Sequence, residues 1–161
     1  MTLQEVTNWP TTGNYVENDV PLTDDYVAGF FDGEGCILIK RTKSGCGMEL
    51  AVQVGQAHED VPYALQDRFG GSVSYAPPEK RPRRKDGGLG SQFWTWAASG
   101  RNAYRFLQTI KERLIVKKSE AEAAMRFYEI KGYHRIHTPE DVVAMKKAYE
   151  NLLVIRREDL R

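Results

Sequence analysis

The stretch Tyr-Val-Ala-Gly-Phe-Phe-Asp-Gly-Glu-Gly at residues 26–35 decides the fold of this chain. It predicts a short helix in which Gly29 and Gly33 lie four residues apart, so both occupy one helix face. A helical glycine costs roughly 1 kcal/mol relative to alanine, so two on one face indicate close packing against another backbone. Gly33 and Gly35 then let the chain turn out of the helix, which displays Glu34 at the end of a close helix pair.

The remaining elements follow from capping residues and from hydrophobic periodicity. Thr23 can cap the first helix, and Asp24 and Asp25 lie in its first turn, where the helix dipole favours negative charge. Alternating apolar side chains at 48–54 give the clearest strand. Together these patterns predict helix 23–34, strand 36–40, strand 48–54, helix 60–69, strand 72–76, strand 92–98, helix 102–113, a helix capped by Ser119 and ended by Gly132, and a last helix from Thr138 to about Val154.

This order predicts an α+β fold with a four-stranded antiparallel sheet and helices on one face. At 161 residues the chain is long enough for one domain with a sizeable core. We expect an N-terminal arm at 1–21, a core at 22–130 and a C-terminal helical extension at 131–161. Trp94 and Trp96 share one sheet face, and the pattern leaves open whether that face is the core.

The formal net charge of +1 hides a strong asymmetry along the chain. Residues 1–39 contain seven acids and no Lys or Arg, whereas residues 68–118 contain twelve Lys and Arg against three acids. Such a bias favours a positive face that meets a polyanion, although basic loops can also simply be solvated. No apolar run approaches the length of about 20 residues that spans a membrane, so no membrane partner is expected.

Residues 27–35, V-A-G-F-F-D-G-E-G, resemble the nine-residue signature of the LAGLIDADG homing endonucleases. Ala28, Gly29, Asp32 and Gly35 match the signature, and Glu34 replaces its last Asp conservatively. Gly33 stands in place of Ala. The resemblance extends over about residues 22–130 and implies the αββαββα fold of that family, with a saddle-shaped sheet over double-stranded DNA.

The resemblance also implies a reaction and an assembly. Glu34 would be the catalytic carboxylate and hold Mg²⁺ or Mn²⁺, which prefer oxygen ligands. Because one signature is present, a homodimer is required, cutting a long pseudo-palindromic site to leave 3′ overhangs. The expected dimer interface comprises Ala28, Gly29, Asp32 and Gly33, with Asp32 mainly structural.

Two more catalytic residues follow from the resemblance. Gln56 corresponds to a residue that orders water in the active site, although strict alternation from Val52 and Val54 places it on the buried side. Lys117 corresponds to a lysine near the scissile phosphate, and its place just before a helix suits that role. Asp60 departs from the family, where a basic residue sometimes stands.

Expected DNA contacts come from the polar side of the first two strands and from the basic loop. Glutamine can pair with adenine and arginine with guanine in the major groove, while loop cations neutralise phosphates. The alternatives are an ordinary exposed Gln53, a solvated helix entry at Lys117 and Lys118, and a localisation signal in the loop. The expected contact residues are Lys40, Glu49, Gln53, Lys80, Arg81, Arg83, Arg84, Lys85 and Lys118.

A second functional hypothesis is a non-catalytic nucleic-acid-binding protein of the same fold, either an RNA maturase that aids intron splicing or a transcription regulator. An intact acid at Glu34 together with Lys117 favours the nuclease. We expect an intracellular protein, in bacterial cytoplasm or in an organelle, with Cys36 and Cys46 reduced. His134 and His137 do not predict zinc, because no further Cys or His ligand is near.

Overall fold

A computed structural model describes residues 22–41, 47–132 and 137–158 of the chain. The predicted N-terminal arm and His134 therefore lie outside the described residues. The elements are α1 (Asp24–Glu34), β1 (Gly35–Arg41), β2 (Met48–Gln56), α2 (Asp60–Phe69), β3 (Ser72–Ala76), a 3₁₀ turn η1 (Pro78–Lys80), β4 (Phe93–Ser99), α3 (Arg101–Ile110), a second turn η2 (Lys111–Arg113), α4 (Lys118–Lys131) and α5 (Pro139–Glu158).

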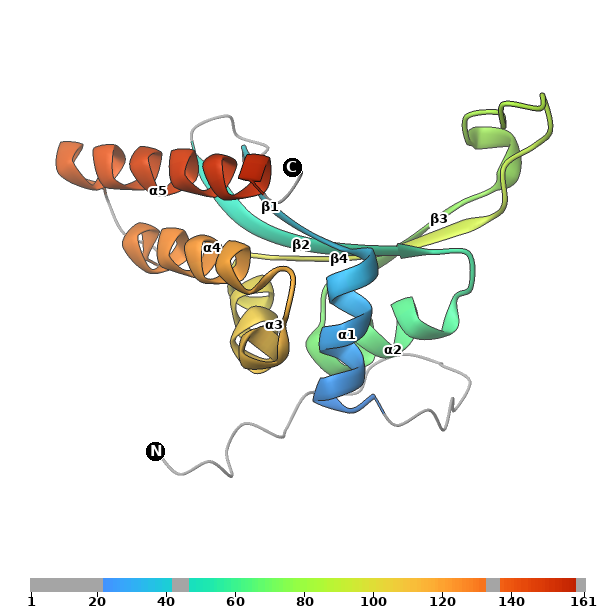
Figure 1. The fold of residues 1–161 in the computed structure, drawn as a ribbon, viewed down its shortest axis with the longest axis horizontal. Coiled ribbons are helices and arrows are strands. Elements are labelled where there is room, and N and C mark those ends of the chain that lie inside the picture. The colour runs from blue at the N-terminus through green and yellow to red at the C-terminus, as the bar shows by residue number, and fades with distance from the viewer. Residues whose placement is uncertain (1–21, 42–46, 133–136, 159–161) are drawn as a thin grey trace.

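The four strands form one antiparallel sheet in the order β1-β2-β4-β3, which confirms the predicted α+β fold. Strands β1 and β2 pair from Gly35 with Val54 to Arg41 with Met48. Helices α1, α2 and α3 lie below the sheet, whose two ends curve upward, so the opposite face is open and concave (Figure 1). The segment that joins β3 to β4 rises beyond the sheet at one end of this concave face (Figure 1). We call residues 77–92 the arm.

Strand alternation separates the two faces and settles the position of the tryptophans. Val52 and Val54 of β2 pair with Ala98 and Trp96 of β4, and all four are buried on the helix side. Trp96 is fully buried, and its Nε1 donates a hydrogen bond to the carbonyl oxygen of Gly70 at 2.8 Å. The tryptophans therefore belong to the core and are not part of the open face.

Four aromatic rings form the centre of this core. The Phe106 ring lies 5.0 Å from the rings of Phe31, Phe69 and Trp96, so α3 joins α1, α2 and β4. A Cβ built on Gly35 would lie 2.2 Å from the Phe31 ring. The glycine that follows α1 is thus required by this ring, and its φ of −81° is open to any residue.

The predicted element ends are correct for α2 and β3 and shift elsewhere. Helix α3 ends at Ile110 and continues as the η2 turn, and α5 extends to Glu158 rather than Val154. The start of α5 is a capping box, because Thr138 Oγ1 accepts from Asp141 N while Asp141 Oδ2 accepts from Thr138 N. None of the described helices is long and apolar enough to cross a membrane.

Helix α5 packs along α4, with Leu152 fully buried between them. An ion pair joins the two helices at one end: Arg156 Nε donates to a carboxylate oxygen of Glu120, whose side chain is only 9% exposed. A buried carboxylate that loses its partner retains its full desolvation cost. The extension is therefore held by an apolar contact and by one buried charge pair.

Replacing Arg156 by alanine should lower the free energy of unfolding by about 2 kcal/mol, because Glu120 would stay buried without its cation. Urea denaturation measures this change. Arg157→Ala is the matched control, since Arg157 is exposed on the same helix and should change stability by less than about 0.5 kcal/mol. Equal losses in both variants would contradict the role assigned to the pair.

Candidate functional site

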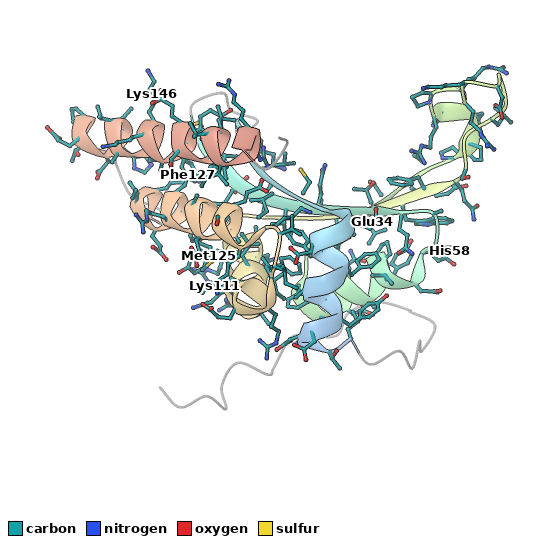
Figure 2. The ribbon with its side chains drawn as sticks, viewed as in Figure 1. Glu34, His58, Lys111, Met125, Phe127 and Lys146 are labelled. Atoms are coloured by element: carbon teal, nitrogen blue, oxygen red, sulfur yellow. The ribbon has the colours of Figure 1, made fainter. Side chains whose placement is uncertain are left out.

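Glu34 is the last residue of α1 and is exposed at the point where the helix meets the sheet (Figure 2). The helix ends there because the chain passes directly into β1 at Gly35. The structure therefore places a solvent-exposed carboxylate at the edge of the concave face. Within the described residues no group of three or more His, Cys, Asp or Glu side chains could hold a metal ion.

The side chain of Asp32, two residues before Glu34, forms several hydrogen bonds with a distant segment of the backbone. Its carboxylate accepts hydrogen bonds from three consecutive backbone N–H groups, those of Ile115 at 2.6 Å, Val116 at 3.3 Å and Lys117 at 2.9 Å. Successive N–H groups of this kind form a nest that binds anions. The carboxylate thus fixes the link between η2 and α4 against the end of α1.

The same contact explains how α4 begins. Ser119 was expected to cap this helix, but α4 begins at Lys118 with Lys117 in the capping position and no side-chain cap from Lys117 in the described part of the chain. The carboxylate of Asp32 supplies the negative charge instead, from a different helix. The sequence prediction was wrong because the capping residue is 85 positions distant from Lys117.

Lys117 is brought to the last turn of α1, the turn that ends at Glu34. Its Nζ donates a hydrogen bond to the backbone carbonyl of Asp32, in the last turn of α1. A cation there interacts favourably with the negative end of the helix dipole, and α1 has no basic residue of its own in that turn. The fixed amine therefore contacts the same helical turn whose last residue is the exposed Glu34.

Gln56 lies at the end of β2, two residues beyond the Val54 that pairs with Gly35. Its side chain falls on the helix side of the sheet, as alternation predicted, and it pairs with Trp94. Its Oε1 is buried and has no hydrogen-bond partner among the described residues. An unsatisfied amide oxygen is costly, so this atom suits an acceptor for a bound water near α1.

The outer face of α1 is open and apolar. A Cβ built on Gly29 or Gly33 would meet nothing within 4 Å among the described residues, and both are exposed. Beside them Ile115 is 89% exposed and Val116 is 62% exposed. Ala28 does not belong to this face: it is fully buried in the chain's own core, so its assignment to the interface is corrected.

Sequence reasoning missed Ile115 and Val116, which lie between two predicted helices and were assigned no role. Their signal was two β-branched apolar residues directly before a lysine pair, in a segment too short to form an element. The Asp32 hydrogen bonds hold the backbone of this link against α1, which leaves the side chains exposed. Large exposed apolar groups side by side are typical of an interaction surface.

Predicted DNA contacts on the first two strands lie on the concave face. Gln53 and Glu49 alternate away from the buried Val52 and Leu50, and Lys40 pairs with Glu49 across the strands. Lys40 is exposed, whereas Glu49 and Gln53 are half-buried. The three side chains thus share one face of the β1–β2 hairpin, opposite the helices.

The arm carries the other predicted contacts and is internally hydrogen-bonded. A tight turn closes its tip, where Arg84 N donates to Gly88 O and Gly87 N donates to Arg84 O, both at 2.9 Å. Arg83 Nη1 donates to Gly87 O at 3.1 Å. Of the five cations of the arm, Arg81 is half-buried. The other four are exposed: Lys80, Arg83, Arg84 and Lys85.

Part of the basic segment serves another purpose. Arg68 and Arg113 pair with Asp24 in the first turn of α1, and Arg113 Nε also donates to Asp25 at 2.9 Å. Lys118, a predicted DNA contact, donates to Glu112 at 2.8 Å. That hydrogen bond lowers the pKa of Glu112 and raises the pKa of Lys118. Asp60, the residue that departs from the family, is exposed in the first turn of α2.

The fold is similar to that of DNA-bound homing endonucleases. Homing endonuclease I-CvuI in complex with its target matches 82% of this chain and 80% of its own, with a TM-score of 0.62 and 16% identity. An archaeal intron-encoded homing endonuclease complexed with DNA gives 0.60 and 15%, covering 82% of each chain. The meganuclease I-SmaMI bound to uncleavable DNA gives 0.57 and 17%, covering 81% of this chain and 44% of its own. No protein-family model and no curated protein matches the sequence. The chain thus has the LAGLIDADG homing-endonuclease fold.

The Asp32 contact generates a stability prediction. Asp32→Asn should lower the free energy of unfolding by about 1–3 kcal/mol, since the amide has one acceptor oxygen and no charge to offer three N–H groups. Asp25→Asn is the control: its carboxylate is 86% exposed and pairs with Arg113, so the loss should stay below about 1 kcal/mol. Denaturation at fixed protein concentration measures both. An Asp32 variant no less stable than the Asp25 variant would contradict the cap.

Proposed function

We propose that this chain is a LAGLIDADG homing endonuclease, a divalent-metal-dependent enzyme that cuts both strands of a long DNA target. The observation that carries the proposal is the exposed Glu34 at the end of α1, in the helical turn that the Lys117 amine contacts through the Asp32 carbonyl. A carboxylate and a fixed cation at the edge of a concave sheet suit phosphodiester hydrolysis. The proposed substrate places the protein inside a cell, in bacterial cytoplasm or in an organelle.

The proposed enzyme is a homodimer joined through the outer face of α1. Gly29 and Gly33 leave room for a second helix to approach closely, and Ile115 and Val116 provide apolar surface beside them. This chain corresponds to four fifths of the I-CvuI chain but to less than half of the I-SmaMI chain, which supports one fold unit per chain. A two-fold axis along α1 would bring the two Glu34 side chains together and make the target roughly palindromic.

The metal would bind between these two carboxylates. A hard cation such as Mg²⁺ or Mn²⁺ takes one or two carboxylates and leaves positions for water and phosphate oxygens, and when bound it supplies Lewis acidity and an activated water. Gln56 would orient water through its unsatisfied Oε1, and Lys117 would neutralise charge on the scissile phosphate. The short 3′ overhangs follow from the family resemblance.

The concave face would receive the DNA. Lys40, Glu49 and Gln53 face it from the β1–β2 hairpin, and the arm adds exposed cations at one end. Polar strand residues can contact base edges in the major groove, while loop cations neutralise phosphates. Lys118 contributes less to this surface than its charge suggests, because Glu112 already pairs with it.

Cleavage-site selection tests the proposal directly. The purified protein is incubated with a randomised or genomic DNA library in Mg²⁺ or in Ca²⁺, and the cut ends are sequenced. One long pseudo-palindromic site, cut in Mg²⁺, is the expected result. Absence of cutting, with a specific RNA or DNA retained in Ca²⁺, would favour a maturase or a regulator.

Glu34→Gln should retain DNA binding and abolish cleavage, because it removes the metal-binding charge from an exposed position without changing shape. Electrophoretic mobility shift in Ca²⁺ measures binding, and product formation in Mg²⁺ measures cleavage. Glu122→Gln is the control, an exposed acid on α4 that should leave both unchanged. Cleavage by the Glu34 variant at the wild-type rate would refute the assigned role.

Gly29→Leu should separate the dimer while the monomer stays folded, since the new side chain meets no described residue within 4 Å. Leucine is also the better helix former. Light scattering measures the mass, and circular dichroism checks the fold. The control is Gln108→Leu, which adds the same side chain on the exposed side of α3. Gly87 in the arm is not suitable as a control, because its φ of 82° disfavours any residue with a side chain. An unchanged mass for Gly29→Leu would exclude this interface.

A further inference from the structure

Arg81 is the arm cation whose guanidinium is stacked on an aromatic ring as well as hydrogen-bonded. Its Cζ lies 4.1 Å from the centroid of the Phe93 ring, and Nη1 donates to the carbonyl of Ser91 at 3.4 Å. We propose that Arg81 contacts a guanine base in each half of the target and thereby sets sequence preference at that position. The proposal rests on DNA binding at the concave face, as proposed above.

Phe93 connects Arg81 to the concave face. Along β4, Trp94 and Trp96 point to the core, so Phe93 points to the open side. Its ring lies over Gly55 of β2: a Cβ built on Gly55 would be 2.4 Å from ring atom Cε1. Gly55 also follows Gln53 by two residues, so it occupies the same face as that predicted base contact. The ring, and the guanidinium stacked on it, therefore belong to the surface that would meet DNA.

The backbone of Arg81 is restrained as well. Arg81 directly follows η1, and its N–H donates to the carbonyl oxygen of Pro78, the first residue of that turn, at 3.2 Å. Pro82 is the next residue in the chain. A residue before proline is confined to extended conformations, which agrees with its φ of −99° and ψ of 155°. Both ends of this long side chain are thus fixed, so binding would cost less conformational entropy than it does for a mobile arginine.

The chemistry of the group selects guanine among the bases. A guanidinium has five N–H donors in a planar fork, and within the described part of the chain only one of its nitrogens makes a hydrogen bond, to Ser91. Guanine presents two acceptors, O6 and N7, in the major groove, which match two donors of that fork. Phosphate would also accept these bonds, but it needs no fixed plane. The exposed cations Lys80 and Lys85 have no such brace and suit phosphate contact.

The experiment compares sequence profiles instead of overall affinity. Binding-site selection in Ca²⁺ is performed with the full chain and with Arg81→Lys, Phe93→Leu and Lys85→Ala. For Arg81→Lys we expect preference for guanine at one position of each half-site to fall about 5- to 150-fold, with the other positions unchanged. Phe93→Leu should weaken the same position, because it removes the brace and keeps the arginine.

Lys85→Ala is the matched control. It should reduce affinity for all sequences alike and lower the salt dependence by about one counterion per contact, without altering the profile. A uniform loss for Arg81→Lys would identify Arg81 as a phosphate contact and overturn the inference, as would an unaltered profile and affinity. If the wild-type chain binds no DNA, the proposed function and this inference both fail. If it binds with a profile that Arg81 does not influence, only this inference fails.

Discussion

The contact between the Asp32 carboxylate and three successive backbone N–H groups is the interaction on which the candidate site depends. It fixes the link between η2 and α4 against α1 and supplies the charge that begins α4. Lys117 completes the contact in the opposite direction by donating to the carbonyl of Asp32. One residue therefore positions the lysine proposed to act in catalysis and fixes the backbone of the link that carries the exposed side chains of Ile115 and Val116.

This arrangement explains why Gly29 and Gly33 lie on the exposed face of α1, whereas Ala28 lies on its buried face. Ala28 is buried in the core, where any larger side chain would displace the packed rings. Gly29 and Gly33 meet nothing in the described part of the chain, so the protein gains no folding stability from their small size. The proposed dimer would account for their cost to helix stability, because a second backbone could then approach this face closely.

The sequence predicted the elements and the sheet because their signals are local. Alternation assigned β2, glycines at 70 and 71 ended α2 with positive φ, and Thr138 with Asp141 formed the expected capping box. The features that it missed depend on distant pairs. Ser119 was preferred as a cap because nothing near it signals Asp32, and the face of Trp94 and Trp96 was decided by sheet pairing. The exposure of Ile115 likewise follows from a contact 83 residues away.

The charge asymmetry has two physical uses that the sequence does not separate. Arg68 and Arg113 neutralise the acids in the first turn of α1, and Lys118 pairs with Glu112, so these cations stabilise the helical layer. The arm holds the exposed group at the opposite side of the sheet (Figure 1). A count of basic residues therefore overstates the positive charge that is left unpaired. The arm has two acids, Glu79 and Asp86, against five cations, so the positive potential is concentrated where the arm rises above the concave face.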